Sequence, residues 1–450
     1  MRAVRAVGER GALRRVVATG VAGAVVVGGA VAGLLALGPD GALRPAPPPR
    51  GAQAAAPGDL GAAIAARQKW LRGHPADAAS WSALATAYVE QARRGADPSY
   101  YPKAQRALER SLAARPSGNL DALIGMGALA NARHDFAAAR VWGERARRAA
   151  PERWPVYPVL VDTYTQLGAY GKATAAVQRL LDLKPALPAF ARAGYELEMQ
   201  GRTEEAAAAL RRALDDATVP AERSFCLHRL GELEWERGDA RAALARYEEA
   251  LRADPDAHPA LAGRAKARAA LGDTGGALAD HRRLTERVPL PEYVLERGEL
   301  EESLGKKGEA RRQYDVLRAE AALFEANGAG DDLTLGLFEA DHGRPADAVR
   351  HLEREWQRRR SVLVADALGW ALHRAGRSQE GLSYAREAGR LGWRRAEFAY
   401  HRGEIERALG MRDAARGHLR EALRLNPHFS PLRAPAARRA LASLEGTDGA

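Results

Sequence analysis

The chain has few of the residues that hold small domains or catalytic centres together. Its 450 residues include one cysteine, Cys226, and only 6% aromatic residues. A single cysteine excludes an internal disulfide framework and a thiolate-rich zinc or iron–sulfur site. Long uncharged runs are also scarce, because only one stretch could cross a bilayer, which excludes a polytopic membrane protein. The folded part must therefore be stabilised by packing.

Length and composition limit how that packing is organised. A single hydrophobic core stops growing at roughly 250 to 300 residues, and this chain is longer. With 46% hydrophobic and 28% charged residues, it is not a wholly disordered chain. We therefore expect either several domains or one elongated repeat.

A net charge of +11 is typical of nucleic-acid-binding proteins, but the distribution of this charge does not favour such a partner. The first 50 residues hold seven arginines against Glu9 and Asp40, a net of +5, which leaves only +6 for the other 400. No aromatic residues interleave with the densest basic run, Arg358–Arg360, as a strand-binding surface would need. We predict a solvated surface of mixed charge and no nucleic-acid partner.

The one long apolar run gives the expected location. Residues 16–37 contain a single polar side chain, Thr19, and 22 helical residues at about 1.5 Å each cover the roughly 30 Å hydrocarbon core. Five arginines and one glutamate precede this run, so the positive-inside rule keeps the N-terminus in the cytoplasm. The pattern predicts a single-pass protein of the cell membrane with its C-terminal part outside.

A cleaved secretory signal is the alternative, because such a signal also has a basic start and an apolar stretch. Ala30-Val31-Ala32 provides a small-x-small cleavage site, and its use would release a secreted soluble protein. Both possibilities stay open. The predicted organisation is a basic N-terminus at 1–15, a transmembrane helix or signal at 16–37, a Pro/Ala-rich linker at 38–58, a helical repeat region with capping helices at 59–445 and a disordered tail at 446–450.

Small residues recur at a nearly constant spacing after residue 58. The intervals lie between 33 and 38 residues and are mostly 33 or 34, at Gly127, Val161, Gly194, Gly231, Ala265, Gly298, Gly336, Gly369 and Gly403. Short amphipathic helices separated by Gly, Asp or Pro fill the intervals. Such self-similarity is typical of a repeat protein.

One copy carries almost the whole signature of a known repeat. It has Leu227, Leu230, Gly231, Gly238, Ala243, Tyr247, Ala250 and Pro255 at the expected positions. The sequence thereby resembles the tetratricopeptide repeat (TPR) family, in a bacterial membrane-anchored or exported member. The resemblance implies an all-α, right-handed superhelical solenoid of about ten helix-turn-helix repeats over roughly 78–427. A helix near 59–73 and a capping helix near 431–445 would flank it.

Some copies depart from this signature. The first contains an insertion that starts at Arg93, Glu355 occupies a position for a small residue, and Trp393 replaces the terminal proline of its repeat. The copies near 329–393 therefore do not fix the register of their repeats from the signature residues.

No catalytic motif is present. The chain lacks a phosphate-binding loop, the HExxH zinc motif, the GxSxG nucleophile motif and paired cysteines, so we predict no enzyme, cofactor or metal site. Cys226 is expected to be a small buried hydrophobic residue, and His373 and His401 are expected at the surface or in turns.

The concave groove is the remaining candidate site. In the TPR family, groove side chains come from the second, fifth, ninth and twelfth positions of the first helix. These positions include Asp162, Tyr195, Glu198, His228, Glu232, Trp235, Lys266, Glu299, Glu302, Asp366, Trp370, His373, Tyr400, Glu404 and Arg407. Seven acids face two bases, which would suit Lys, Arg or aromatic residues of a peptide, unless these are ordinary solvated helix faces.

The sequence therefore favours a protein–protein interaction scaffold. We expect a membrane-anchored TPR protein that binds peptide or protein partners outside the membrane during assembly of an envelope complex. A secreted soluble binding protein and an enzyme with an unrecognised active site are the alternatives. The partner, the pathway and the oligomeric state cannot be read from the sequence.

Overall fold

The computed structural model describes residues 60–446, which contain 22 α-helices and no strand. The predicted apolar span at 16–37, the linker at 38–58 and the tail after residue 446 lie outside these residues. Among the helices described, none combines the length and the apolar character that a membrane crossing requires.

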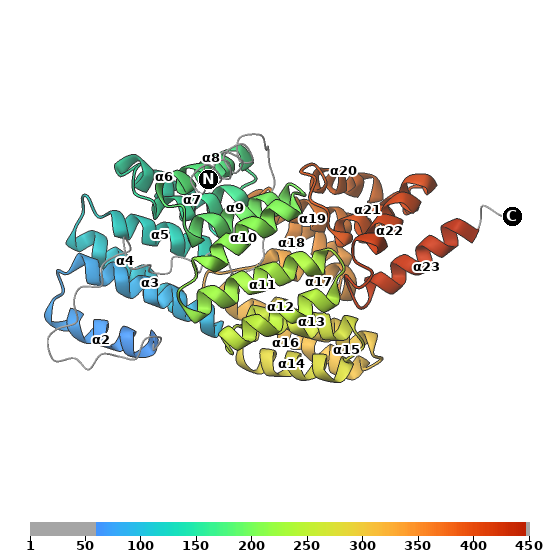
Figure 1. Ribbon diagram of the computed structural model, residues 1–450, viewed down its shortest axis with the longest axis horizontal. Helices are drawn as coiled ribbons and strands as arrows, with labels where there is room; N and C mark the ends of the chain where they lie inside the picture. The colour runs from blue at the N-terminus through green and yellow to red at the C-terminus, as the bar shows by residue number, and fades with distance from the viewer. Residues whose placement is uncertain (1–59, 447–450) are drawn as a thin grey trace, which may run out of the picture.

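The helices form one isolated helix, ten antiparallel pairs and a final helix, which confirms the predicted TPR-like solenoid (Figure 1). The isolated helices are α2 (Leu60–Gly73) and α23 (Arg433–Gly446). The first five pairs are α3 (Ala78–Gly95) and α4 (Tyr100–Ala114), α5 (Leu120–Ala132) and α6 (Phe136–Ala149), α7 (Val156–Gln166) and α8 (Tyr170–Leu183), α9 (Leu187–Met199) and α10 (Thr203–Asp215), and α11 (Pro220–Glu236) and α12 (Ala240–Ala253). The last five are α13 (His258–Ala270) and α14 (Thr274–Arg287), α15 (Pro291–Ser303) and α16 (Lys307–Ala326), α17 (Asp332–His342) and α18 (Pro345–Arg358), α19 (Val362–Arg374) and α20 (Ser378–Ala388), and α21 (Ala396–Ala408) and α22 (Arg412–Leu425).

The helix boundaries follow from local capping. Several second helices of a pair begin after an aspartate whose carboxylate accepts a hydrogen bond from the backbone N–H three residues later. Asp135 accepts from Ala138 at 3.0 Å and Asp239 from Ala242 at 2.9 Å. These caps fix where the hairpins that contain them turn.

Small residues let the two helices of a pair touch. A Cβ added to Gly231 on α11 would lie 2.7 Å from Cε1 of Tyr247 on α12, closer than real atoms approach. The glycines of the predicted small-residue series all have a packing reason of this kind, because a Cβ added to any of them would lie 2.5 to 3.0 Å from a neighbouring atom. Glu355 is the exception in its pair, and its buried carboxylate forms an ion pair with Arg359.

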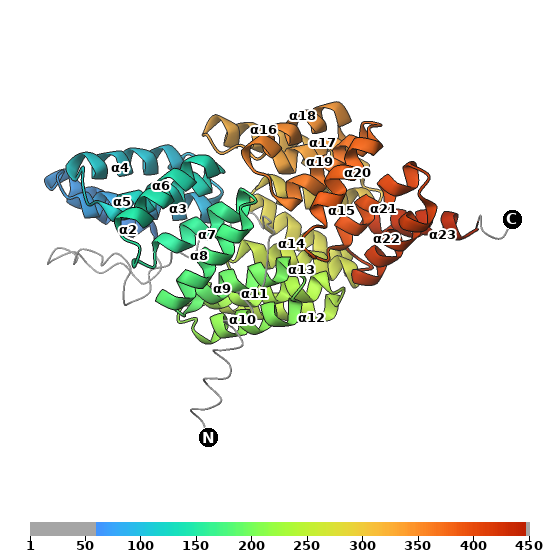
Figure 2. The ribbon, with the colours of Figure 1, turned by 90° about the horizontal axis from the view of Figure 1, so that it is seen from above.

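The solenoid curls until residues about 190 apart touch. Figure 2 shows the chain running from α2–α6 through α9–α12 and back toward α16–α20. Arg359 donates to Gln166 at 3.0 Å, and the Val362 N–H donates to the Tyr170 hydroxyl at 3.2 Å. The turn within an early helix pair thus docks on the loop between two late pairs.

The same contact is repeated twice further along the chain. A Cβ on Gly201 would lie 2.5 Å from the carbonyl oxygen of Gly392, and the Asn426 amide donates to the Trp235 carbonyl at 2.8 Å. Both contacts again join residues 191 positions apart. Successive superhelical turns therefore pack edge to edge instead of leaving an open spiral.

The insertion in the first helix pair joins this closure. Ala96, at the end of α3, packs in one cluster with Leu261, Ala262 and Tyr293 of the sixth and seventh pairs. The N-terminal end of the solenoid thus covers part of the inner surface of its middle.

Candidate functional site

A partly enclosed cavity of about 410 Å³ lies between the middle of the solenoid and its C-terminal part. One side is formed by α11, α13, α14 and α15, and the other by the start of α21, the loop after α22 and the start of α23. Ligand pockets have volumes of about 300 to 1,000 Å³, so a small molecule or a few amino-acid residues would fill it.

The first group in the cavity is built around Glu232 on α11. Tyr247 donates to its carboxylate at 2.5 Å, and the Lys266 ammonium of α13 lies 3.7 Å away. Burial alone would raise the pKa of Glu232, but Lys266, His228 and the Tyr247 hydrogen bond together lower that pKa to about 2. Glu232 is therefore ionised at neutral pH.

The second group is an arginine from the far side of the cavity. Arg395 lies 3.1 Å from Glu236 of α11 and 3.6 Å from Glu397 of α21. Burial would lower the pKa of this guanidinium, but Glu236 and Glu397 raise it. Arg395 therefore ties the start of α21 to the inner wall of α11.

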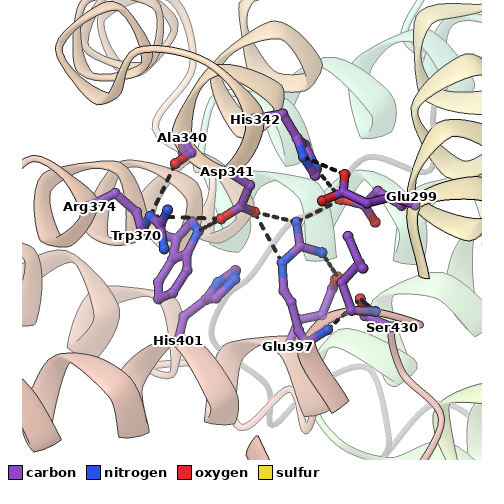
Figure 3. A network of polar contacts seen from close by, with 12 residues as sticks. Glu299, Ala340, Asp341, His342, Trp370, Arg374, Glu397, His401 and Ser430 are labelled. Atoms are coloured by element: carbon purple, nitrogen blue, oxygen red, sulfur yellow. Dashed lines mark hydrogen bonds and ion pairs between the residues drawn. The ribbon is translucent and has the colours of Figure 1, made fainter. Parts of the chain in front are cut away.

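The third group centres on Arg433, the first residue of α23, and Figure 3 shows the carboxylates around it, Asp341, Glu299 and Glu397. Its guanidinium lies 2.5 Å from Asp341, 3.2 Å from Glu299 and 3.6 Å from Glu397. Asp341 also accepts a hydrogen bond from the Trp370 indole at 3.0 Å. Burial raises the pKa of Asp341, but Arg433 more than offsets this and leaves that pKa below its ordinary value. One arginine thus joins α15, α17 and α21.

A fifth carboxyl group in the cavity has no such partner. Glu296 of α15 makes no hydrogen bond or ion pair within residues 60–446, and its Oε2 is buried. Burial raises the pKa of Glu296 to about 7 even though Lys266 acts in the opposite direction. Glu296 is therefore partly protonated at neutral pH.

Four of the residues predicted from the repeat positions line this cavity: Glu232, Trp235, Lys266 and Glu299. His228, one turn before Glu232, instead lines a second cavity of about 510 Å³ between α11, α13 and the insertion after Arg93. Burial lowers the pKa of His228 to about 4, so its imidazole is neutral there.

The other predicted groove residues are occupied by contacts within the chain. Asp162 pairs with Arg192 at 2.7 Å and Glu198 with Arg229 at 2.5 Å, in each case from the next helix pair. The remaining contacts join Asp366 to His401, Trp370 to Asp341, Glu302 to Tyr314, Glu404 to Arg407, Tyr195 to Trp393 and Tyr400 to Phe429. Three of the seven predicted acids, Asp162, Glu198 and Glu299, are thus paired with arginines outside the predicted positions.

Two further expectations about single residues have opposite outcomes. Cys226 is fully buried, as predicted. The surface position expected for His401 is wrong, because it is 3% exposed and its Nδ1 lies 2.8 Å from Asp366. His373 is only half-buried and its Nδ1 contacts Ser378 at 3.0 Å.

Sequence reasoning missed several residues of the cavity. Glu397 occupies a second position of its helix, so the repeat pattern could have found it, and Glu296 lies one place beyond a fifth position. Arg395 and Arg433 gave no signal, since they reach the wall only through the closure of the superhelix. Among the residues described, no group of three or more His, Cys, Asp or Glu could hold a metal ion.

No family model matches the chain, and no curated protein sequence does. Solved structures with a similar fold include PilW, a type IV pilus biogenesis factor, at 21% identity over 45% of this chain and 94% of that chain, with a TM-score of 0.39. Yeast Tom70 has 15% identity over 85% of this chain and 89% of its own, with a TM-score of 0.40. Human IFIT1, solved as a dimer with PPP-AAAA, has 14% identity over 82% and 87%, with a TM-score of 0.45. The TPR-like fold of this chain rests on its own helix pairs and their register.

Proposed function

We propose that this chain is a polypeptide-binding scaffold whose binding site is the cavity between α11, α13, α15 and the C-terminal segment. A single observation carries the proposal: four of the predicted groove residues line this cavity, whereas the second cavity is lined by only one of them, His228. The predicted groove residues Asp162 and Glu198 are instead taken up by ion pairs within the chain. The cavity volume suits a few residues of a partner, so specificity would come from a short segment.

We also propose that the scaffold is held outside the cell membrane by its apolar N-terminal segment, where it serves the assembly of an envelope complex. Support comes from the sequence alone, through the uncharged run at 16–37 and the arginines before it. Membrane fractionation and the intact mass of the mature protein test this point. A mature chain that lacks the first 32 residues and leaves the membrane fraction would establish the secreted alternative.

Site-specific photo-crosslinking tests the binding site. Leu304 lines the cavity and is 38% exposed, whereas Met411 is equally exposed and does not line it. A photoreactive amino acid at Leu304 is expected to crosslink a defined segment of a partner in membranes, identified by mass spectrometry. The same group at Met411 should not. Equal crosslinking at both sites, or none at Leu304, would contradict the proposal.

One observation favours a second candidate, an enzyme. Glu232 and Glu296 line the same cavity, and their pKa values are moved apart, to about 2 and about 7. Such a pair matches the needs of general base and acid catalysis. Hydrolysis of peptide or glycoside substrates by the full chain, lost in both Glu232→Gln and Glu296→Gln, would establish an enzyme. The absence of turnover over a broad substrate panel would leave the scaffold.

A further inference from the structure

The charges of the cavity are not balanced by the protein itself. Five carboxyl groups line it, from Glu232, Glu236, Glu296, Glu299 and Glu397. The buried or half-buried cations that line it are Lys266, Arg395 and Arg433. The remaining base, Arg438, is exposed and donates to the Pro427 carbonyl at 2.5 Å. The cavity therefore holds two more carboxyl groups than buried cations.

The three buried cations are all committed to particular carboxylates. Lys266 lies beside Glu232, while Arg395 and Arg433 take the other three acids between them. Glu296 is the carboxyl group left over, with a buried oxygen that contacts no donor in the described part of the chain. A buried acceptor without a partner costs free energy, so a ligand that supplies a donor there is favoured.

A second side chain in the cavity also lacks a partner. His281 of α14 is 2% exposed and lines the cavity, and its Nδ1 makes no hydrogen bond within residues 60–446. Burial and Lys266 lower the pKa of His281 to about 4, so its imidazole is neutral near pH 7 and can accept a hydrogen bond. An anionic ligand would meet five carboxyl groups here, whereas a cation with several N–H donors would meet unpartnered acceptors on Glu296 and His281.

We infer that the cavity binds one organic cation, a primary ammonium or a guanidinium group, with Glu296 as its counter-ion and His281 as a further acceptor. The inference rests on the proposed function for the source of that group, a lysine or arginine side chain of the bound polypeptide. A free polyamine carries the same chemistry, and the experiment separates the two. Trp235 adds an aromatic face over which the Lys266 ammonium already lies at 5.8 Å.

Protonation of Glu296 replaces the missing cation when the cavity is empty. Its carboxyl group faces Glu232 on α11, Lys266 on α13, Glu299 on its own helix and Glu397 on α21, and Lys266 is the only cation that acts appreciably on its pKa. Binding of a cation must therefore displace the proton. With a pKa of about 7 in the empty site, the ionised fraction rises about tenfold between pH 6 and pH 8, and the affinity for the cation should rise with it.

Calorimetric titration of the full chain in detergent tests the inference. The probes are a blocked pentapeptide with lysine between alanines, the same peptide with arginine or norleucine in place of lysine, and spermidine. We expect the lysine or arginine peptide to bind at least about tenfold more tightly than the norleucine peptide, because the ammonium or guanidinium gains a charge-assisted bond. Glu296→Gln should remove this preference and its pH dependence, whereas Glu325→Gln, at an exposed glutamate of α16, should change neither.

Each outcome separates the two proposals. Equal binding of the lysine and norleucine peptides, or an unchanged preference in Glu296→Gln, overturns the cation site and leaves polypeptide binding intact. Binding of spermidine without any peptide supports the cation site and contradicts the polypeptide function. If no probe binds, the cation site is overturned, and the crosslinking experiment at Leu304 decides the polypeptide function. Circular dichroism of each variant confirms that the fold is retained.

Discussion

Glu198 on α9 and Glu299 on α15 both lie on the inner wall, and both are neutralised by an arginine, but the arginines come from different distances. Arg229 follows Glu198 by 31 residues and belongs to the next helix pair, whereas Arg433 follows Glu299 by 134 residues. The first ion pair forms as soon as two neighbouring pairs stack. The second forms only when the superhelix closes. The inner wall is therefore built by contacts between neighbouring helix pairs, whereas the cavity depends on contacts between segments far apart in the chain.

Breaking the ion pair between Glu198 and Arg229 should destabilise the protein more than any other change proposed below. Arg229→Met leaves Glu198 buried at 6% exposure without a counter-charge, and we expect a loss of about 3 to 5 kcal/mol in the free energy of unfolding. Urea denaturation followed by circular dichroism measures this. The matched control is Arg237→Met, which removes an ion pair to Glu204 with almost the same spacing at the surface and should cost about 1 kcal/mol or less.

A double variant separates the lost charge balance from lost packing. Glu198→Met with Arg229→Met replaces the pair by two apolar side chains of similar length, and it should recover most of the stability. If the double variant is as unstable as Arg229→Met alone, the unpaired charge of Glu198 does not explain the loss. The inner wall would then not depend on this ion pair.

Breaking the contacts of Arg433 should release α23 from the cavity without unfolding the rest of the solenoid. Arg433→Met removes the cation from Asp341, Glu299 and Glu397, and we expect a loss of about 2 to 3 kcal/mol that is limited by the release of α23. Hydrogen exchange measured by mass spectrometry should show faster exchange in α23 and unchanged exchange in α9. Arg439→Met, at an exposed position of α23, should leave both unchanged. Faster exchange throughout the chain would show that α23 does not open independently but unfolds together with the rest of the solenoid.

The contact between superhelical turns can be tested at one glycine. Gly201 and Gly305 occupy equivalent turns with φ of 71° and 77°, so alanine is strained at both by about 1 kcal/mol. A Cβ at Gly201 would also meet the Gly392 carbonyl, whereas at Gly305 nothing lies within 4 Å. Gly201→Ala should therefore cost about 1 to 2 kcal/mol more than Gly305→Ala in thermal or urea unfolding. Equal losses would show that the turns do not press on one another.

The comparison also explains what the sequence could predict. The fold could be predicted because each helix pair repeats the same kind of contact, such as Gly231 against Tyr247. In the sequence, this contact appears as a regular spacing of small residues. Glu232 and Lys266 were accessible for the same reason, since their positions follow from the repeat. Arg433 was not, because its place depends on how far the superhelix turns per pair, and the angles at the successive junctions between α15 and α23 add up.

Glu296 gives the smallest expected effect on stability. The sign of its pH dependence distinguishes an unpaired carboxyl group of the cavity from carboxylates that are paired with arginine. Its folded pKa of about 7 lies above the roughly 4.3 of an exposed glutamate, so the folded state holds a proton that the unfolded state loses between these values. This residue therefore lowers stability as the pH rises from about 4.5 to 7. Asp341, with its depressed pKa, acts oppositely and destabilises the protein only as the pH falls through its folded pKa.

Glu296→Gln removes this titration and keeps the shape of the side chain. We expect the variant to match the wild type at pH 5 and to be more stable by about 1 kcal/mol at pH 8, a value reduced for the solvent that reaches the cavity. Urea unfolding at both pH values measures the difference, with Glu325→Gln as the exposed control. A variant that is less stable than the wild type at pH 8 would mean that Glu296 has a cationic partner within the chain. The carboxyl groups of the cavity would then all be neutralised by cations of the chain itself, as Glu198 on the inner wall is.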